Sequence, residues 1–159
     1  MIVREARPGD AQAFADILNP LIDEGTSTAI EGHQRAEDWA WLARGDSQRT
    51  VCFVATDDEG RVLGFQYLEP ARDTAQAASI ASFARPDGGR RGVGAALFAR
   101  TRGAAGHLGY AKIVAVIRAD NVSGLAYYSK MGFHDTEVFR DVPMADGRPV
   151  DRIKKVFDL

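Results

Sequence analysis

Residues 88–94 concentrate the residue types that could bind an anion. This segment contains four glycines and two arginines, and a run with helical apolar spacing follows it. Glycines leave backbone N–H groups uncovered, and the helix adds the positive end of its dipole. Arg90 and Arg91 add formal positive charge at the same place. The combination suits a diphosphate group.

Two nucleotide-binding loops of known pattern fit this glycine-rich segment less well. A Walker loop needs Gly-Lys followed by Ser or Thr, which the chain lacks. A dinucleotide-binding loop needs a third glycine where Leu97 stands, and an acidic residue about 20 positions further on, which is also missing. A glycine-rich turn without any ligand remains the structural alternative.

The elements that must position this loop are visible in the apolar spacing. Phe14, Ile17, Leu18 and Leu21 recur at intervals of three and four, as on one face of a helix, and Asp10 precedes them as a candidate cap. Leu63, Phe65 and Tyr67 alternate with smaller or polar residues, which predicts a half-buried strand. The predicted order is strand 2–6, helix 10–25, helix 36–43, strands 50–56, 63–67 and 77–84, a helix from the loop to Gly109, strand 113–117, helix 121–131, and strands 133–142 and 150–158.

Composition narrows the class of protein. The chain has 159 residues, of which 45% are apolar, and this suits one mixed α/β domain with a real core. A net charge of −2 argues against nucleic acid or an anionic membrane as a partner. The single cysteine excludes an intrachain disulfide. The three histidines have no ligand spacing, so no metal is expected. The sequence shows no signal core and no membrane span. The cytoplasm is the expected location.

A second motif lies downstream of the glycine loop. Residues 121–133 read Asn-Val-Ser-Gly-Leu-Ala-Tyr-Tyr-Ser-Lys-Met-Gly-Phe. This segment is similar to the Asn…Tyr-x-Lys-x-Gly-Phe segment of the GCN5-related N-acetyltransferases. Residues 89–94, Gly-Arg-Arg-Gly-Val-Gly, resemble the coenzyme A loop of the same family, Arg/Gln-x-x-Gly-x-Gly/Ala. The two motifs in register, with the same order of elements, extend the resemblance over the whole chain.

Within that family the early segment looks most like the phosphinothricin acetyltransferase branch. Asn19–Ile22 and Glu24–Thr28 carry this likeness. Two departures stand out. Gly89 occupies the first position of the loop motif, and Ser79 occupies the place where the branch tends to carry a glutamate as general base. The missing carboxylate argues against herbicide-type substrate specificity.

The resemblance implies a fold and a mechanism. The expected fold is one domain over residues 1–159, with a mixed, mostly antiparallel sheet and a splayed parallel pair formed by the fourth and fifth strands. Acetyl-CoA is then the cosubstrate, and an amine attacks the thioester without a covalent enzyme intermediate. An alkyl ammonium has a pKa of about 10, so its proton must be removed first. Tyr128 matches the family's acid for the leaving thiolate.

The site residues implied by the resemblance fall into three groups. The catalytic residues are Tyr128, Asn121 and Ser79, the last as anchor of a water relay. The substrate residues are Glu24 and Thr26, with Glu24 a second candidate base. The coenzyme-binding residues are Ser82, Phe83, Ala84, Arg85, Gly89, Arg90, Arg91, Gly92, Val93, Gly94, Ala95, Asn121 and Tyr128.

Several alternatives stay open at the level of the sequence. Tyr128 could be a core aromatic with Tyr127 in its place, and Asn121 could be only a helix cap. The leading function is acetylation of a small amine such as an amino acid. The competing functions are coenzyme A binding without turnover and acetylation of a protein or peptide. A pocket closed by residues 24–30 and the last hairpin favours a small substrate, and a homodimer is a further expectation from the family.

Overall fold

The computed structural model describes residues 1–44, 48–86 and 92–159. Every predicted element is present within these residues, in the predicted order. The largest boundary difference is in the third strand, which extends beyond 63–67 at both ends. The elements are β1 Ile2–Glu5, η1 Pro8–Asp10, α1 Ala11–Glu24, α2 Ala36–Arg44, β2 Val51–Thr56, β3 Val62–Pro70, β4 Ala77–Ala84, α3 Val93–His107, β5 Lys112–Arg118, α4 Val122–Met131, β6 His134–Pro143 and β7 Pro149–Asp158.

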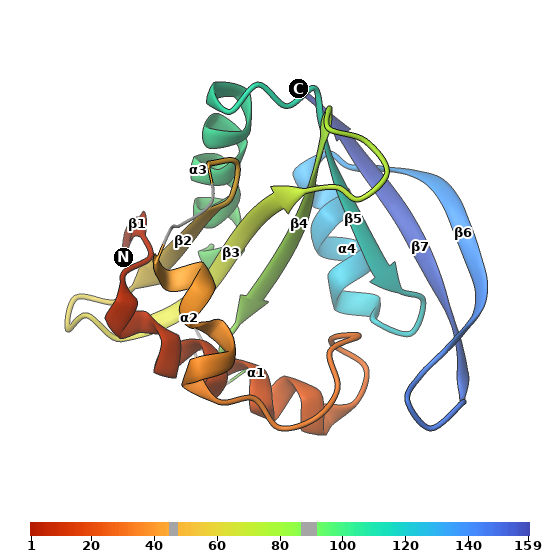
Figure 1. The fold of residues 1–159 in the computed structure, drawn as a ribbon, viewed down its shortest axis with the longest axis horizontal. Helices are drawn as coiled ribbons and strands as arrows, with labels where there is room; N and C mark the ends of the chain where they lie inside the picture. Colours follow the sequence, from red (N-terminus) through yellow and green to blue (C-terminus); the bar gives the residue numbers. More distant parts are fainter. Residues whose placement is uncertain (45–47, 87–91) are drawn as a thin grey trace.

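The strands form a seven-stranded sheet in the order β1-β2-β3-β4-β5-β7-β6. All neighbouring pairs are antiparallel except β4 and β5, which are parallel and joined through α3. β4 pairs with β5 only from Ala77 to Ser79, and beyond this point the two strands diverge (Figure 1). The expected α/β fold with a splayed parallel pair is therefore confirmed.

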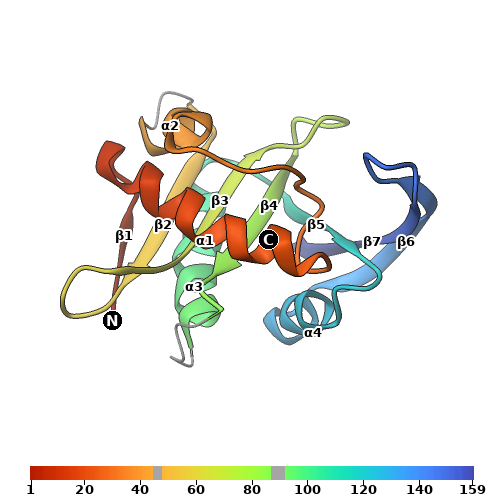
Figure 2. The same cartoon turned by 90° about the horizontal axis from the view of Figure 1, so that it is seen from below.

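Helices cover both faces of the sheet. Figure 2 shows α1 and α2 on one face and α3 and α4 on the other. On the first face the ring of Phe14 stacks on that of Phe65, with ring centroids 4.2 Å apart. On the second face the rings of Phe98 and Phe133 pack together, with centroids 5.4 Å apart. β3 lies between these layers and is buried on both sides, so the prediction of a half-buried strand is wrong. Gln66 in β3 is fully buried as a result.

Within the described residues, no helix combines the length and the apolar character that a membrane span requires.

Asp10 stabilises the start of the chain in a way that the sequence did not predict. Its side chain makes no capping hydrogen bond to α1. Its carboxylate instead accepts hydrogen bonds from Nη1 and Nη2 of Arg4, at 2.8 and 2.9 Å, and from the backbone N–H of Arg7 at 2.7 Å. Burial raises the pKa of Asp10, but these hydrogen bonds and positive charges outweigh it and hold the pKa below its ordinary value.

Asp10→Asn should destabilise the protein by roughly 1–3 kcal/mol at pH 7, because it weakens a hydrogen-bonded pair that joins β1 to the start of α1. The pKa of Asp10 is lower in the folded state, so its stabilising effect is present above the unfolded-state pKa of about 4 and is lost as the pH falls through the folded-state pKa. Urea unfolding should show that the difference in free energy of unfolding between wild type and variant is smaller at pH 3 than at pH 7. An equal gap at both pH values would contradict the assignment, and the exposed Asp16→Asn serves as control.

Candidate active site

A cleft opens where β4 and β5 separate. β4 is paired with β3 from Ala78 to Ala84, but with β5 only as far as Ser79. In residues 80–84, the backbone groups that point toward β5 therefore have no strand partner. Two adjoining cavities of about 290 and 220 Å³ lie here and share part of their lining. The first extends to the start of α3, and the second extends to residues 27–30 and the end of β5.

The first turn of α3 lies at one end of this cleft. Gly92 precedes the helix with φ +89° and, as a glycine, has no side chain that could cap the helix. The N–H groups of Val93, Gly94 and Ala95 therefore have no intrahelical acceptor, and Gly94 lines the first cavity. Free N–H groups at the positive end of a helix dipole can hold an anion. Gly89, Arg90 and Arg91, which the sequence also predicted here, lie outside the described residues.

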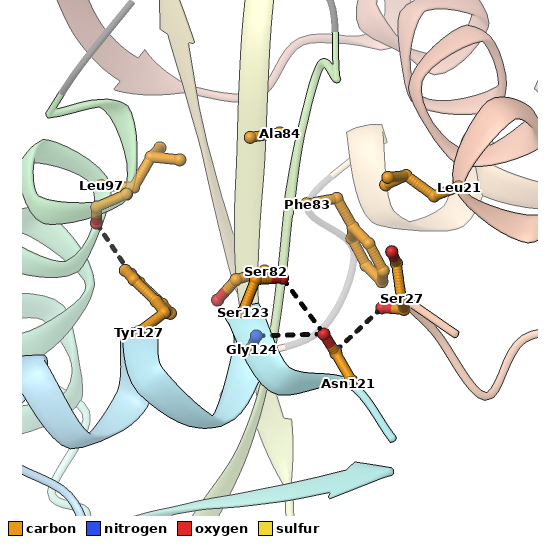
Figure 3. Close-up of a pocket in the computed structure, with 11 residues that line it drawn as sticks. Leu21, Ser27, Ser82, Phe83, Ala84, Leu97, Asn121, Ser123, Gly124 and Tyr127 are labelled. Carbon is orange, nitrogen blue, oxygen red and sulfur yellow. Dashed lines mark hydrogen bonds between the residues drawn. The ribbon is translucent and has the colours of Figure 1, made fainter. Parts of the chain in front are cut away.

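Asn121 joins α4 to the opposite wall of the cleft. Its Oδ1 accepts a hydrogen bond from the N–H of Gly124 at 3.0 Å, so it caps α4 as the sequence indicated. Its Nδ2 donates to the carbonyl of Ser27 at 3.2 Å. Figure 3 shows Asn121 between these two partners, with its side chain lining the first cavity. The capping role and a position in the cleft therefore coexist in one residue.

The two neighbouring tyrosines of α4 have different surroundings. Tyr127 Oη donates to the carbonyl of Gly94 at 2.8 Å and accepts from Nε2 of Gln66 at 3.0 Å. Tyr128 is buried, lines the second cavity, and its Oη lies 2.8 Å from Oγ of Ser82. Burial raises the pKa of both phenols, so both are protonated near neutral pH. The proton of Tyr127 is committed to a carbonyl, whereas Tyr128 shares a hydrogen bond with a hydroxyl that can donate or accept.

Ser82, Phe83 and Ala84 of β4, which the sequence predicted as coenzyme-binding residues, line the cleft. Three other predicted residues do not line either cavity. Ser79 stands at the last β4–β5 pair, half-buried, and is absent from the lining of both cavities. Arg85 donates from Nε to the carbonyl of Val62 at 2.6 Å, and the Val93 side chain packs into the core beneath α3.

Glu24 and Thr26 lie beside the cleft but line neither cavity. The Glu24 carboxylate accepts hydrogen bonds from the backbone N–H and hydroxyl groups of both Thr26 and Ser27. The side-chain hydrogen bonds from Ser27 and Thr26 lower the pKa of Glu24 to about 2. A carboxylate this weakly basic, with its oxygens occupied, shapes the turn after α1 and is poorly suited to accept a proton from an amine.

Residues 27–30 line the second cavity, and the segment 27–31 is held in place from two sides. Arg118 in β5 is only 3% exposed, and it donates from Nη1 to the carbonyl of Thr28 at 3.0 Å. The same guanidinium forms an ion pair with Asp120 at 2.7 Å. From the other side, Oε2 of Glu31 accepts from the N–H of Ala145, in the turn between β6 and β7, at 2.8 Å. These contacts join the loop after α1 to the last hairpin.

Two buried polar residues that contact the lining of the cleft carried no motif in the sequence. Gln66 lies in an apolar strand, and Arg118 follows a continuous apolar run. A long polar side chain inside a run destined for burial is the signal that could have identified both, because such a group needs buried partners. Ser27 and Gly124 lie within the segments 24–28 and 121–133 that carried the family resemblance, but nothing marked either residue individually.

The Acetyltransferase (GNAT) family profile matches residues 17–133. This span is more than half of the 159 residues, so the chain belongs to the GNAT acetyltransferase family. It is an acyl-CoA-dependent N-acetyltransferase, as its two motifs predicted, and its cosubstrate is acetyl-CoA. Among the described residues, no group of three or more His, Cys, Asp or Glu side chains is arranged to hold a metal ion.

Individual relatives agree with this class. The [ribosomal protein bS18]-alanine N-acetyltransferase of Escherichia coli strain K12 is 29% identical over 120 residues, covering 72% of this chain and 79% of the relative. The ribosomal-protein-alanine N-acetyltransferase of Brucella melitensis has a TM-score of 0.89 at 21% identity and full coverage of both chains. A phosphinothricin acetyltransferase from Sinorhizobium meliloti, solved with acetyl-CoA, has a TM-score of 0.86 at 21% identity, covering 99% of this chain and 88% of that one. At these identities the solved structures establish the fold alone.

Gly94→Ala should destabilise this protein, although the family pattern admits alanine at this position. A Cβ on Gly94 would lie 2.6 Å from Cε1 of Tyr127, so the ring must move and its hydrogen bond to the Gly94 carbonyl is strained. We expect the free energy of unfolding, measured with urea, to fall by about 1–2 kcal/mol.

Gly103→Ala, in the same helix, is the matched control. A Cβ there has no neighbour within 4 Å, and alanine should stabilise the helix by about 0.5–1 kcal/mol. If the two variants had equal stability, the close approach of Tyr127 to Gly94 would not constrain the fold.

Proposed function

We propose that residues 1–159 form one acetyltransferase unit that transfers an acetyl group from acetyl-CoA to the amine of a small molecule. The observation that carries this proposal is the cleft between β4 and β5. The first turn of α3, which follows Gly92, lies at one end, and the buried phenol of Tyr128 lines the adjoining cavity. The start of a helix can bind the diphosphate of an acyl carrier, and a phenol in the same cleft can protonate the thiolate that leaves.

The residues present fit the coenzyme. Backbone groups of Ser82–Ala84 that lack a partner in β5 are free to pair with the amides of a pantetheine arm. The N–H groups of residues 93–95 would hold the diphosphate, and Asn121 would contact the arm from α4. Acetyl-CoA supplies an acyl group activated as a thioester, so the protein needs no nucleophile of its own.

The reaction then requires two proton transfers, one to the leaving sulfur and one from the amine. The hydroxyl of Tyr128 donates a proton to the sulfur as the carbon–sulfur bond breaks, and its raised pKa keeps that proton available at neutral pH. The amine must also lose a proton before it attacks. No carboxylate or imidazole lines the second cavity among the described residues, which supports release of that proton to solvent water. The base is then not a side chain, in keeping with Ser79 at the usual glutamate position.

What supports a small acceptor is the cover over the second cavity. Residues 27–31 are bonded to Asn121 and Arg118 on one side and to the N–H of Ala145 on the other. An extended peptide needs an open groove, whereas these contacts join the loop after α1 to β5, to the start of α4 and to the last hairpin. The lining includes Ile30, Tyr67 and Val116, so an acceptor with an apolar side chain suits it better than a polyamine.

A thiol-release assay across amines tests the acceptor class. We expect turnover with small amino acids or amines carrying apolar groups, and little with a peptide that begins with alanine, the residue named for the E. coli relative. Peptide turnover exceeding that of every small amine would overturn the small-molecule assignment. Acetyl-CoA binding in calorimetry without thiol release from any acceptor would leave a coenzyme-binding module.

Tyr128→Phe should lower kcat by about 10²-fold or more while leaving the Kd of acetyl-CoA nearly unchanged, because it removes only the donated proton. The measurement is steady-state thiol release together with calorimetry. Tyr110→Phe is the matched control, since the Tyr110 hydroxyl is buried and bonded to the carbonyl of Arg49 at 2.8 Å, outside the cleft. A kcat for Tyr128→Phe equal to that of Tyr110→Phe would remove Tyr128 from the acid role.

A further inference from the structure

Gln66 occupies a place where an apolar residue would be expected. It lies in the centre of β3 and is 0% exposed, directly opposite Ser82 of β4. Its Nε2 donates to Ser82 Oγ at 2.8 Å and to Tyr127 Oη at 3.0 Å. Its Oε1 is buried and has no hydrogen-bond partner among the described residues. An unpaired buried oxygen destabilises the folded state, so the presence of this amide calls for a role for its two donors.

The orientation of the Gln66 amide follows from its neighbours. Tyr127 has one hydroxyl proton, and that proton is donated to the Gly94 carbonyl, which can only accept. The Gln66 atom that faces Tyr127 must therefore be the NH₂ group. Because the same NH₂ group also faces Ser82, Ser82 Oγ accepts a hydrogen bond from Gln66.

This arrangement leaves Ser82 and Tyr128 with one hydrogen bond of undetermined direction. Their oxygens lie 2.8 Å apart, and either can be the donor. If Tyr128 donates to Ser82, its only proton is turned away from the cavity. If Ser82 donates to Tyr128, the phenol proton is free to point into the second cavity. Gln66 already occupies one acceptor position of Ser82 with a donated N–H, which favours the second direction.

We propose that Gln66 and Ser82 are positioning residues that set the direction of the hydrogen bond at Tyr128. The chain of donors runs from Gln66 Nε2 to Ser82 Oγ, from Ser82 to Tyr128 Oη, and from Tyr128 into the cavity. This proposal rests on the acid role of Tyr128 in the proposed function. As the amine nitrogen bonds to the acyl carbon and the carbon–sulfur bond breaks, sulfur keeps the electron pair and takes the phenol proton. The phenolate accepts the hydrogen bond of Ser82 until a proton from solvent restores it.

Gln66→Met tests this direction, because methionine fills a similar volume without donors. Both acceptor positions of the Ser82 hydroxyl are then free, and a hydrogen bond donated by Tyr128 to Ser82 is no longer disfavoured. We expect kcat to fall roughly 10–100-fold while the KM for acetyl-CoA stays within about twofold. The protein should remain folded, since the unpaired Oε1 is removed together with the two donors.

Gln66→Glu adds a readout that a merely structural role would not produce. The ionised carboxylate accepts the only hydroxyl proton of Ser82. Tyr128 must then donate its own proton to Ser82, so that proton is no longer available to the leaving thiolate. When protonated, the same group can donate to Ser82 again. The ratio of variant to wild-type kcat should therefore rise as the pH falls through the pKa of the introduced carboxyl group, which burial raises above its ordinary value of about 4.3. A ratio independent of pH contradicts the proposal.

A measurement on the ligand-free protein separates this proposal from the acid role itself. Labelling the four tyrosines with ¹³C at Cζ reports whether each phenol donates or accepts. The Tyr128 resonance, assigned by its loss in Tyr128→Phe, should shift in Gln66→Met, while that of Tyr110 should not. An unchanged Tyr128 resonance overturns the positioning proposal and leaves the acid role standing. A wild-type kcat in Tyr128→Phe overturns the acid role. The direction of the hydrogen bond between Ser82 and Tyr128 would then have no effect on catalysis.

Two further comparisons complete the test. In a Tyr128→Phe background, Gln66→Met should cause no additional loss of kcat, because Gln66 acts through the missing hydroxyl. An equal loss in both backgrounds would assign Gln66 a structural role instead. Thr101→Val is the matched control, since the Thr101 hydroxyl is fully buried in α3 and unpaired among the described residues. Its kcat should equal that of wild type.

Discussion

The separation of β4 from β5 after Ser79 is the constraint on which the site depends. Two parallel strands that stayed paired would satisfy each other's backbone groups and leave no opening between them. β4 remains bonded to β3 along its other edge, so this stretch stays in the sheet while its backbone groups without a β5 partner face the cleft. Since α3 connects these two strands, the polypeptide itself brings the first turn of that helix to the same opening (Figure 1).

Polar groups buried in the wall of the cleft form a connected network. Gln66, Ser82, Tyr127 and Tyr128 come from β3, β4 and α4, and their hydrogen bonds fix these elements relative to one another. In a low-dielectric interior such bonds are strong when satisfied and costly when broken. The network therefore couples the position of α4 to that of the sheet, and through Tyr127 to the first turn of α3. Small errors in packing here would act on the coenzyme side and the acceptor side together.

The cavity that we propose for the acceptor has walls from β4, β5 and α4 and one side formed by the loop after α1. The bonds of Arg118 to Thr28 and of Glu31 to Ala145 hold that loop. Relatives at about 21% identity keep the fold, with TM-scores of 0.86–0.89, because the sheet and its two helical layers tolerate many apolar sequences. The loops have no such common framework, so differences among them are free to change the acceptor while the donor stays the same.

The sequence alone determined the order of elements, the mixed sheet and the two motifs, because apolar periodicity and glycine positions are local properties. It also identified Asn121 as a cap, since Asn at the start of a helix is favoured by local hydrogen bonding. Only the tertiary structure decided that β3 is covered on both faces, that Gln66 meets Ser82 and Tyr127, and that Glu24 turns its carboxylate to its own loop. These facts depend on residues distant in the chain meeting at a buried surface, and no local pattern specifies which ones will meet.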